Sequence, residues 1–257
     1  MNLSIDNLSF SYKKDREVLK NVTFSIKNGE SISILGRNGS GKTTLIRLIL
    51  GFLKAPYGTI TIDGDDISTI GGRARAEKIA YIPQHSEISY PFTVLETAVM
   101  GAAPRVGIFS KPSHKDYEKA EENLRILGID SLRNRQINMI SGGERQLAMI
   151  ARALTQDAEL LLLDEPANEL DYSNQLLILE KIEELRDSGY SVLFSTHNPE
   201  HALMIASSVL ILSNGVSSIH RTDELKDGRL LSELYNRELF ITEIDTGKNR
   251  RISCLPK

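Results

Sequence analysis

The sequence is poor in cysteine, in net charge and in long apolar runs, and each shortage excludes a class of protein. Cys254 is the one cysteine in 257 residues, which excludes an intramolecular disulfide and a metal cluster held by the cysteines of a single chain. The formal net charge of −3 gives no excess of positive charge for non-specific binding to nucleic acid. The longest apolar runs, residues 160–163 and 209–212, are far shorter than the about 20 residues that a membrane-spanning helix needs.

Signals of targeting and of repeated architecture are also missing. The first ten residues alternate polar and apolar side chains, without the basic and apolar regions of a signal peptide. There is no internal repeat, no low-complexity linker and no heptad pattern of coiled-coil length. A chain of 257 residues can form one large domain or two small ones and bury a substantial core. We therefore expect a cytoplasmic protein, which would work at a membrane by docking on an embedded partner.

The rest of the sequence is organised around residues 36–43, which read Gly-Arg-Asn-Gly-Ser-Gly-Lys-Thr. They stand between an alternating apolar run at 31–35, predicted to be a strand, and a helical pattern that continues to Gly51. In this context the glycines let backbone N–H groups point at a triphosphate, and the helix N-terminus adds partial positive charge. Lys42 is predicted to reach the outer phosphates, and the Thr43 hydroxyl to hold Mg²⁺. The alternative is a glycine-rich connecting loop that binds no ligand. Residues 36–43 are called the phosphate loop below.

Two adjacent carboxylates follow a second predicted core strand. Residues 160–163 are four leucines, as in a parallel strand covered by helices on both faces. Asp164 and Glu165 then stand at its carboxyl end, where ligands of open α/β sheets bind. We predict that Asp164 orients the Mg²⁺ shell and that Glu165 polarises an attacking water.

Polar residues also end two further predicted strands. Gln84 follows the apolar strand at 78–83, and its neutral amide can reach a metal or a water. His197 follows the buried strand at 191–196. A histidine there is by itself more often a capping or hydrogen-bonding residue than a catalytic one.

A second glycine-lined helix start lies at residues 141–144, Ser-Gly-Gly-Glu, before an apolar helix at 147–154. Ser141 and Glu144 have the spacing of a capping box, which alone would explain a well-started helix. The two glycines add the features of an anion-binding helix end. Asp171 stands at the start of the next predicted helix and could serve as its N-terminal cap.

The remaining segments predict supporting structure. Strands at 2–12 and 21–27, joined by a polar turn at 13–16, and another at 59–63 predict an antiparallel sheet that leans on the nucleotide core. Tyr12 in this sheet either stacks on an adenine ring or packs, and residue type weighs the two equally. Further predicted elements are an amphipathic helix at 115–127, a short helix at 230–235, and a hairpin with strands at 240–244 and 250–253 around 246–248.

Together these motifs resemble those of the ATP-binding cassette (ABC) proteins. Residues 141–146 look like the signature motif of that family, at its place between the phosphate loop and the carboxylates. Tyr12 falls where the family has its adenine-stacking aromatic residue, and Gln84 at its lid glutamine. Asp171 matches the D-loop aspartate and His197 the switch histidine. The resemblance covers almost the whole chain, with the motifs in the family's order.

The resemblance implies an α/β fold, a P-loop NTPase (RecA-like) core with an antiparallel β-subdomain and an inserted helical subdomain. It implies a single ABC ATPase domain over residues 1–257. Within it, the core would take about 1–85 and 155–257, and the helical subdomain with the signature motif about 86–154.

The cofactors that the resemblance implies are ATP and Mg²⁺. The residues implied to be catalytic are Lys42, Glu165 and His197. Those implied to hold Mg²⁺ are Thr43, Gln84 and Asp164. Those implied to bind ATP are Tyr12, Gly36, Arg37, Asn38, Gly39, Ser40, Gly41, Lys42, Thr43, Thr44, Ser141, Gly142, Gly143, Glu144 and Asp171.

A finer similarity links the sequence to the ATPase subunits of importers for iron chelates, cobalamin or molybdate, through residues 91–97, 143–147, 174–175 and 196–202. It implies a membrane permease and an indirect link to a substrate-binding protein, and the family as a whole implies a head-to-tail homodimer formed with ATP. Because residues 90–92, Tyr-Pro-Phe, stand close to Gln84, we expect the permease to be contacted through residues 84–101. The importer similarity also implies a place at the cytoplasmic face of the membrane, and the lack of basic excess indicates no nucleic-acid partner.

Two alternatives compete with the importer. A soluble ABC ATPase acting on DNA or the ribosome is disfavoured by the single cassette and by the lack of coiled-coil arms and of basic excess. A non-enzymatic nucleotide-binding regulator would lack Lys42, Asp164 or Glu165, and all three are present. One departure from the family concerns residues 166–171, which lack the small hydroxyl residue common after the proline.

Overall fold

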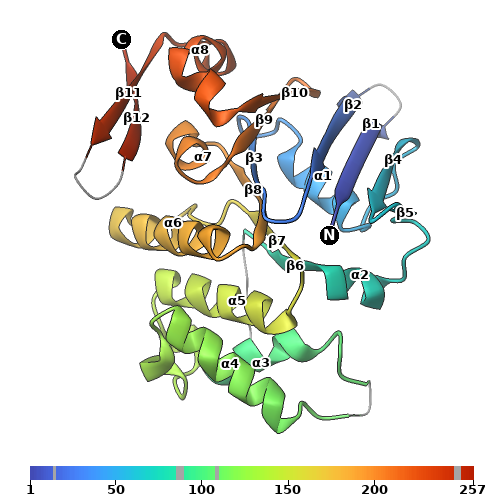
Figure 1. The fold of residues 1–257 in the computed structure, drawn as a ribbon, viewed down its shortest axis with the longest axis vertical. Coiled ribbons are helices and arrows are strands. Elements are labelled where there is room, and N and C mark those ends of the chain that lie inside the picture. Colours follow the sequence, from blue (N-terminus) through green and yellow to red (C-terminus); the bar gives the residue numbers. More distant parts are fainter. Residues whose placement is uncertain (14–15, 85–89, 108–109, 246–249) are drawn as a thin grey trace. The chain divides into compact units, whose positions relative to one another are not determined.

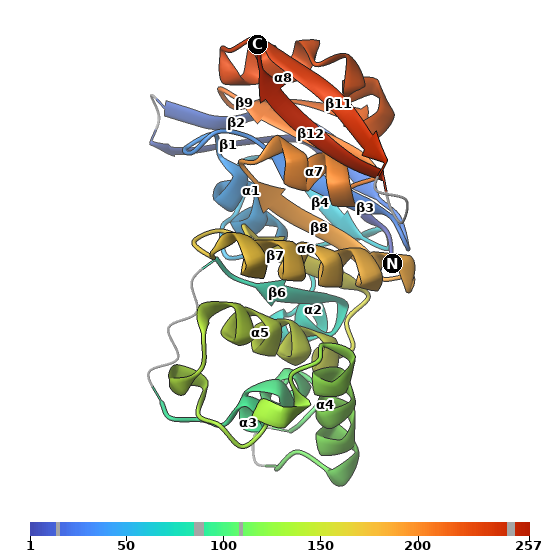
Figure 2. The same ribbon diagram turned by 90° about the vertical axis from the view of Figure 1, so that its left-hand side faces the viewer.

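The computed structural model describes residues 1–13, 16–84, 90–107, 110–245 and 250–257. They form two compact units, one of Met1–Thr69 with Ser191–Lys257 and one of Ile70–Tyr190. Figures 1 and 2 label the helices and strands of both. Among the described residues, no helix is long and apolar enough to cross a membrane.

The first unit begins with the predicted antiparallel sheet. Its strands are β1 (Leu3–Lys13), β2 (Arg16–Ile26), β4 (Tyr57–Ile62) and β5 (Asp65–Asp66), in the order β5-β4-β1-β2. Strand β2 begins five residues before the predicted start at 21. The prediction missed this part because Asn21, with a φ of 48°, interrupts the alternation, so that Leu19 and Val22 are both buried. The predicted turn includes residues 14–15, which lie outside the described part of the chain.

Three parallel strands form the centre of this unit. β3 (Ser31–Leu35) lies between β8 (Ser191–Thr196) and β9 (Ser208–Ser213), in parallel with both. Every residue of β3 and β8 is buried, including the serines of the alternating run at 31–35, as in strands covered on both faces. Helix α1 (Lys42–Ile49) follows β3, and α7 (Pro199–Ile205) follows β8.

A strand that the sequence did not predict extends the sheet after β9. A turn at Asn214-Gly215 follows β9, with φ values of 50° and 82° that suit a tight hairpin. It leads into β10 (Val216–Arg221), which pairs with β9 and, at Val216, with Lys20 of β2. Strand β10 is largely exposed and partly polar, so its sequence lacks the hydrophobic alternation that would have predicted a strand.

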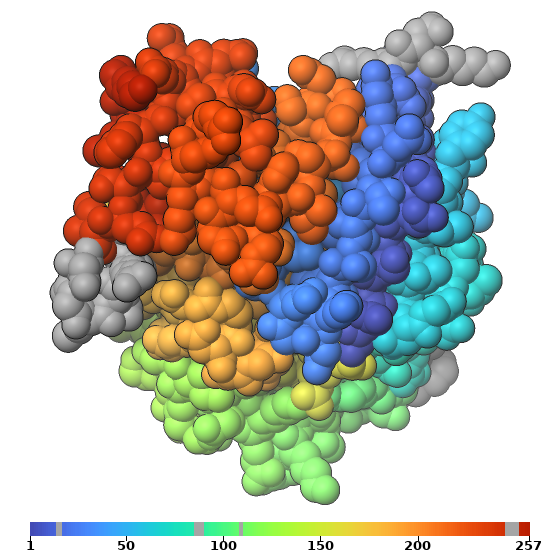
Figure 3. Space-filling view, turned by 45° about the horizontal axis from the view of Figure 1, so that its top comes forward, coloured from blue at the N-terminus to red at the C-terminus, as the bar shows by residue number. Residues whose placement is uncertain are grey.

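The C-terminal segment of the first unit contains the short helix and the hairpin that the sequence predicted. A 3₁₀ helix (Thr222–Asp227) leads to α8 (Arg229–Tyr235), and β11 (Leu239–Asp245) pairs with β12 (Arg250–Pro256). The predicted hairpin turn at 246–248 lies outside the described residues. This segment, orange to red in Figure 3, forms a continuous part of the surface.

The second unit combines two parallel strands with helices. Strand β6 (Ile79–Ile82) pairs with β7 (Leu160–Asp164). The α-helices are α2 (Gly72–Lys78), α3 (Val94–Val99), α4 (His114–Ile126), α5 (Gly142–Gln156) and α6 (Tyr172–Asp187). Single-turn 3₁₀ helices lie at Met100–Ala102, Asp130–Leu132 and Ile137–Met139. The sequence did not predict α2, which has no buried residue and therefore no apolar face.

Helix α5 is the centre of the helical part, and α3 and α4 pack on it (Figure 1). A Cβ on Gly101, after α3, would overlap the carbonyl oxygen of Arg152 in α5, so the close approach of the two segments requires glycine. The buried Asn123 of α4 donates to the Thr155 hydroxyl of α5 over 3.1 Å. The predicted division of the chain into a nucleotide-binding core and a helical subdomain at 86–154 stays a prediction. The compact unit 70–190 is larger than that subdomain, because it also contains β6, β7 and α6.

Candidate functional site

The phosphate loop connects β3 to α1, as predicted, and crowding fixes its first glycine. The Gly36 N–H donates to the Thr196 carbonyl at the end of β8 over 3.2 Å. A Cβ on Gly36 would lie 2.5 Å from the Leu212 carbonyl oxygen and would also overlap the Ser40 hydroxyl. Gly41, directly before α1, has a φ of 107°. The loop therefore needs glycine at one position for space and at another for backbone conformation.

Lys42 lies inside this loop and is only 5% exposed. Its ammonium donates to the carbonyls of Gly36 over 2.8 Å and Arg37 over 3.3 Å. The buried Ser40 hydroxyl has no hydrogen-bond partner among the described residues. The N-terminal cap of helix α1 is Gly41, which has no side chain to accept from the first N–H groups of the helix. An ammonium, a hydroxyl and a helix N-terminus fit a phosphate chain.

Tyr12, near the end of β1, is connected to the same helix. Its hydroxyl lies 3.3 Å from the Thr44 hydroxyl in the first turn of α1. Its ring stands edge-on to Phe10, with centroids 4.9 Å apart. The residue is nevertheless 55% exposed. Packing on Phe10 thus leaves much of the Tyr12 ring accessible, which is compatible both with a packing role and with stacking on an adenine ring.

His197 follows β8, beside the start of the phosphate loop. Leu35 of β3 and Thr196 of β8 are partners in the parallel register, so the two strands end at the same level. His197 is exposed, and its carbonyl accepts a hydrogen bond from the Tyr235 hydroxyl over 2.6 Å. Nearby, burial lowers the pKa of His201, and the charge of His197 lowers it further. Sequence reasoning missed Tyr235, because no local pattern relates it to a residue 38 positions away.

The second unit holds the two carboxylates and Gln84. Ile82 of β6 and Leu163 of β7 are partners, so Asp164, the last residue of β7, and Gln84, two residues after β6, lie at the ends of neighbouring strands. Asp164 is only 2% exposed, whereas Glu165 is half-buried. Glu165 has a φ of 48°, a left-handed conformation that is rare for a residue with a side chain. Such outliers mark positions where the surrounding structure imposes the backbone geometry.

The signature-like stretch forms the capping box that its spacing predicts. The Ser141 N–H donates to the Glu144 carboxylate over 2.8 Å, and the Glu144 N–H donates to the Ser141 hydroxyl over 3.3 Å. The first of these bonds is the main reason why the pKa of Glu144 is below its ordinary value. A Cβ on Gly143 would overlap the Asn174 side chain of α6, which explains the second glycine.

Asp171 caps α6, as the sequence predicted. Its carboxylate accepts the Asn174 N–H over 2.9 Å and the Asn174 side-chain amide over 2.7 Å. Hydrogen bonding, mainly by that backbone N–H, lowers the pKa of Asp171. Asn174 therefore joins the start of α6 to Gly143 of the signature-like stretch, a link that the sequence did not predict.

Each unit thus brings together part of the predicted set. The first contains Tyr12, residues 36–44 and His197, and the second contains Gln84, Asp164, Glu165, residues 141–144 and Asp171. In the described part of the chain, no group of three or more His, Cys, Asp or Glu side chains could hold a metal ion. The residues predicted for Mg²⁺ are instead a hydroxyl, an amide and a carboxylate.

Comparison with known proteins establishes the family. The model of the ABC transporter family matches residues 19–168, and the chain belongs to this family. It is an ABC transporter ATPase with the mixed α/β cassette fold of P-loop NTPases, which confirms the predicted fold class and activity.

Three similar proteins are informative. The molybdate import ATP-binding protein MolC of Haemophilus influenzae is 31% identical, over 93% of this chain and 89% of MolC. A probable iron chelatin transport ATP-binding protein of Helicobacter pylori is 38% identical, over 83% of this chain and 84% of the relative. The structure of a putative metal-chelate type ABC transporter in an inward-facing conformation has a TM-score of 0.87 and 29% identity, over 99% of this chain and 97% of that chain.

Proposed function

We propose that this ATPase drives the uptake of a metal chelate or of molybdate through a membrane permease. The observation that carries the proposal is the near full-length similarity to ATP-binding proteins named for transport of iron chelates and import of molybdate. The match over 99% of the chain to a subunit of a putative metal-chelate type transporter supports it. The protein would then work at the cytoplasmic face of the membrane, and a substrate-binding protein would deliver the solute.

The chemistry would be ATP hydrolysis at the phosphate loop. The backbone of residues 36–41 and the Lys42 ammonium would hold and neutralise the phosphates, since phosphoryl transfer depends on positioning and charge stabilisation. Glu165 would orient a water in line with the outer phosphate. His197 would contact that phosphate and sense its presence. Strands β3 and β8 end at the same level, and this register supports the proposed role of His197 as the sensor of the outer phosphate.

The residues predicted for Mg²⁺ suit this ion by their chemistry. The Thr43 hydroxyl, the Gln84 amide oxygen and the Asp164 carboxylate are all oxygen donors, which a hard cation prefers. When bound, Mg²⁺ would neutralise charge on the phosphate oxygens.

We further propose that two copies form the site together, head to tail. The start of α5, Ser141-Gly142-Gly143, would close on the nucleotide held by the partner's phosphate loop, and Asp171 would lie at the same interface. Closure would then require ATP, and hydrolysis would reopen the dimer. The packing of Gly143 on Asn174, which Asp171 holds, supports a signature and D-loop that move together.

The permease would be contacted through residues 84–101. Tyr90 is 70% exposed, and its ring lies 5.8 Å from that of Phe92 by centroid distance. These aromatic residues precede α3, which packs on the signature helix α5. Residues 85–89 of the proposed contact segment lie outside the described part of the chain.

The proposal is tested by transport. The protein is co-expressed with permease subunits from neighbouring genes and reconstituted into vesicles. Uptake of a radiolabelled iron chelate and of radiolabelled molybdate is then measured with internal ATP. We expect uptake of one class of solute, abolished by Lys42→Ala. Robust ATP hydrolysis that associates with no permease and drives no uptake would overturn the importer assignment.

A further inference from the structure

The C-terminal segment, residues 222–257, lies against the connection that carries His197. In the views of Figures 1 and 2, α7 follows β8 and lies beside β12, and the two elements are in contact. Residues 197–200 form the link between β8 and α7; we call them the switch segment. In the described part of the chain, the C-terminal segment bonds to it at His197 and at Glu200, and neither of these residues belongs to the phosphate loop.

The first contact is made at His197 itself. The Tyr235 hydroxyl, from the last residue of α8, donates to the His197 carbonyl over 2.6 Å. Burial raises the pKa of Tyr235 above its ordinary value, so the hydroxyl keeps its proton throughout the physiological range. This bond fixes the backbone of His197 one residue after β8 ends.

The second contact is made at Glu200, in the first turn of α7. Its carboxylate accepts the Ser253 hydroxyl over 2.8 Å and the Cys254 N–H over 2.9 Å, both from β12. The Glu200 N–H in turn donates to Asn198, the N-terminal cap of α7. The C-terminal segment therefore holds both ends of the switch segment.

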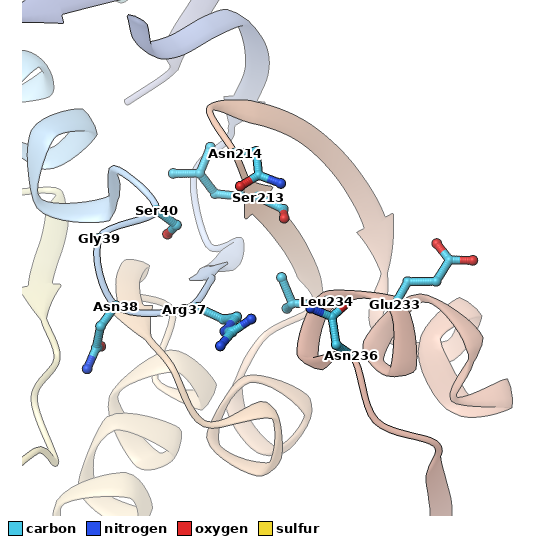
Figure 4. A pocket seen from close by; sticks show the side chains of 10 residues that line it. Arg37, Asn38, Gly39, Ser40, Ser213, Asn214, Glu233, Leu234 and Asn236 are labelled. Atoms are coloured by element: carbon cyan, nitrogen blue, oxygen red, sulfur yellow. The ribbon is translucent and has the colours of Figure 1, made fainter. Parts of the chain in front are cut away.

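The C-terminal segment also borders the phosphate loop. A cavity of about 320 Å³ is lined by residues 37–40, by 212–214 at the end of β9, and by Glu233, Leu234 and Asn236 around the end of α8 (Figure 4). Arg37 is close enough to Tyr235 that its charge opposes the rise in the tyrosine pKa. The end of α8 is thus near both parts of the nucleotide machinery in this unit.

We infer that Tyr235 is a positioning residue for His197, through which the C-terminal segment sets the rate of ATP hydrolysis. The inference rests on the proposed role of His197 as the sensor of the outer phosphate. The hydrogen bond to the His197 carbonyl restrains the backbone from which the imidazole projects. Loss of this bond leaves the phosphate loop and Lys42 in place, so it affects hydrolysis rather than ATP binding.

The test is a double-mutant cycle on the full chain. Tyr235→Phe removes only the hydroxyl, and Tyr117→Phe on α4, in the other unit, is the matched control. We expect Tyr235→Phe to lower kcat by about three- to tenfold, the range for one net hydrogen bond. Affinity for a fluorescent ATP analogue and the melting temperature change little, and Tyr117→Phe behaves as wild type. In a His197→Ala background, Tyr235→Phe has no further effect on kcat.

The outcomes separate this inference from the proposed function. If His197→Ala leaves hydrolysis unchanged, the sensor role of His197 is wrong and the inference falls with it. If His197→Ala lowers kcat but Tyr235→Phe does not, only the positioning role is overturned. The same holds if Tyr235→Phe lowers kcat equally with and without His197. Ser253→Ala, which removes one donor to Glu200, is a second variant for the case in which the Tyr235→Phe protein is unfolded. If Ser253→Ala then leaves kcat unchanged, the C-terminal segment does not set the rate of hydrolysis, and the inference is overturned.

Discussion

The crowding around Gly36 allows one prediction to be worked out in detail. A methyl group there would lie 2.5 Å from the Leu212 carbonyl oxygen, about 1 Å inside ordinary van der Waals contact. The φ of Gly36 is not positive, so the penalty of Gly36→Ala is steric rather than conformational. Because the obstacle is backbone, the loop itself must shift. Overpacking of this kind costs about 1–3 kcal/mol, and we expect the upper part of that range.

The matched control is Gly29→Ala, in the turn before β3. Gly29 has a φ of 77°, but no atom lies within 4 Å of its would-be Cβ. Its substitution therefore carries only the conformational penalty of a left-handed backbone, about 1 kcal/mol. It lies outside the phosphate loop, so ATP affinity should stay at the wild-type value.

The two variants are compared by urea unfolding and by titration with a fluorescent ATP analogue. For Gly36→Ala we expect a loss of about 2–3 kcal/mol in the free energy of unfolding. We also expect at least about tenfold weaker nucleotide binding, since a shifted loop misplaces several N–H donors and the Lys42 ammonium together. If Gly36→Ala binds ATP as tightly as Gly29→Ala does, the phosphate loop is not the nucleotide site or its first glycine is not crowded, and the reasoning is refuted.

Three further predictions concern hydrolysis, coupling and stability. Glu165→Gln should abolish hydrolysis and accumulate a dimer with ATP but not ADP in size-exclusion chromatography; a protein that stays monomeric with ATP would contradict the shared site. The pair Tyr90→Ala and Phe92→Ala should uncouple ATP turnover from uptake in vesicles at unchanged ATP affinity, whereas weaker ATP binding would count against a permease contact there. The pKa of Glu144 is lowered from its ordinary value of 4.5, so its capping carboxylate stabilises the fold at any pH above 4.5. This stabilisation is lost as the pH falls through the lowered pKa. Glu144→Gln should therefore flatten part of the decline in melting temperature between about pH 6 and 3, and identical profiles for the two proteins would contradict it.

The sequence predicted the elements whose signal is local. Strand β7 begins with four leucines, apolar residues alternate with serine in β3, and β8 has an apolar centre. The start of α5 has the Ser-x-x-Glu spacing of a capping box. Strand β10 and helix α2 were missed because neither buries a regular apolar face. A single-sequence pattern carries no information about such elements, which depend on the neighbours that they pair with or cover.

The same distinction applies to the candidate site. The motif residues could be placed at strand ends because parallel strands bring their carboxyl ends to one edge. The contacts of Tyr235 with His197 and of Asn174 with Gly143 could not, since they join residues 38 and 31 positions apart in sequence without a repeating pattern. These links follow from tertiary packing, and only coordinates reveal them.

The backbone conformation of Glu165 has a consequence for how this position can vary. With a φ of 48°, the residue occupies a region that glycine enters without penalty and that costs other residues about 1 kcal/mol or more. Glycine would remove this backbone penalty together with the carboxylate proposed to activate water. The residue that the backbone conformation favours and the residue proposed to activate water are therefore different at this position.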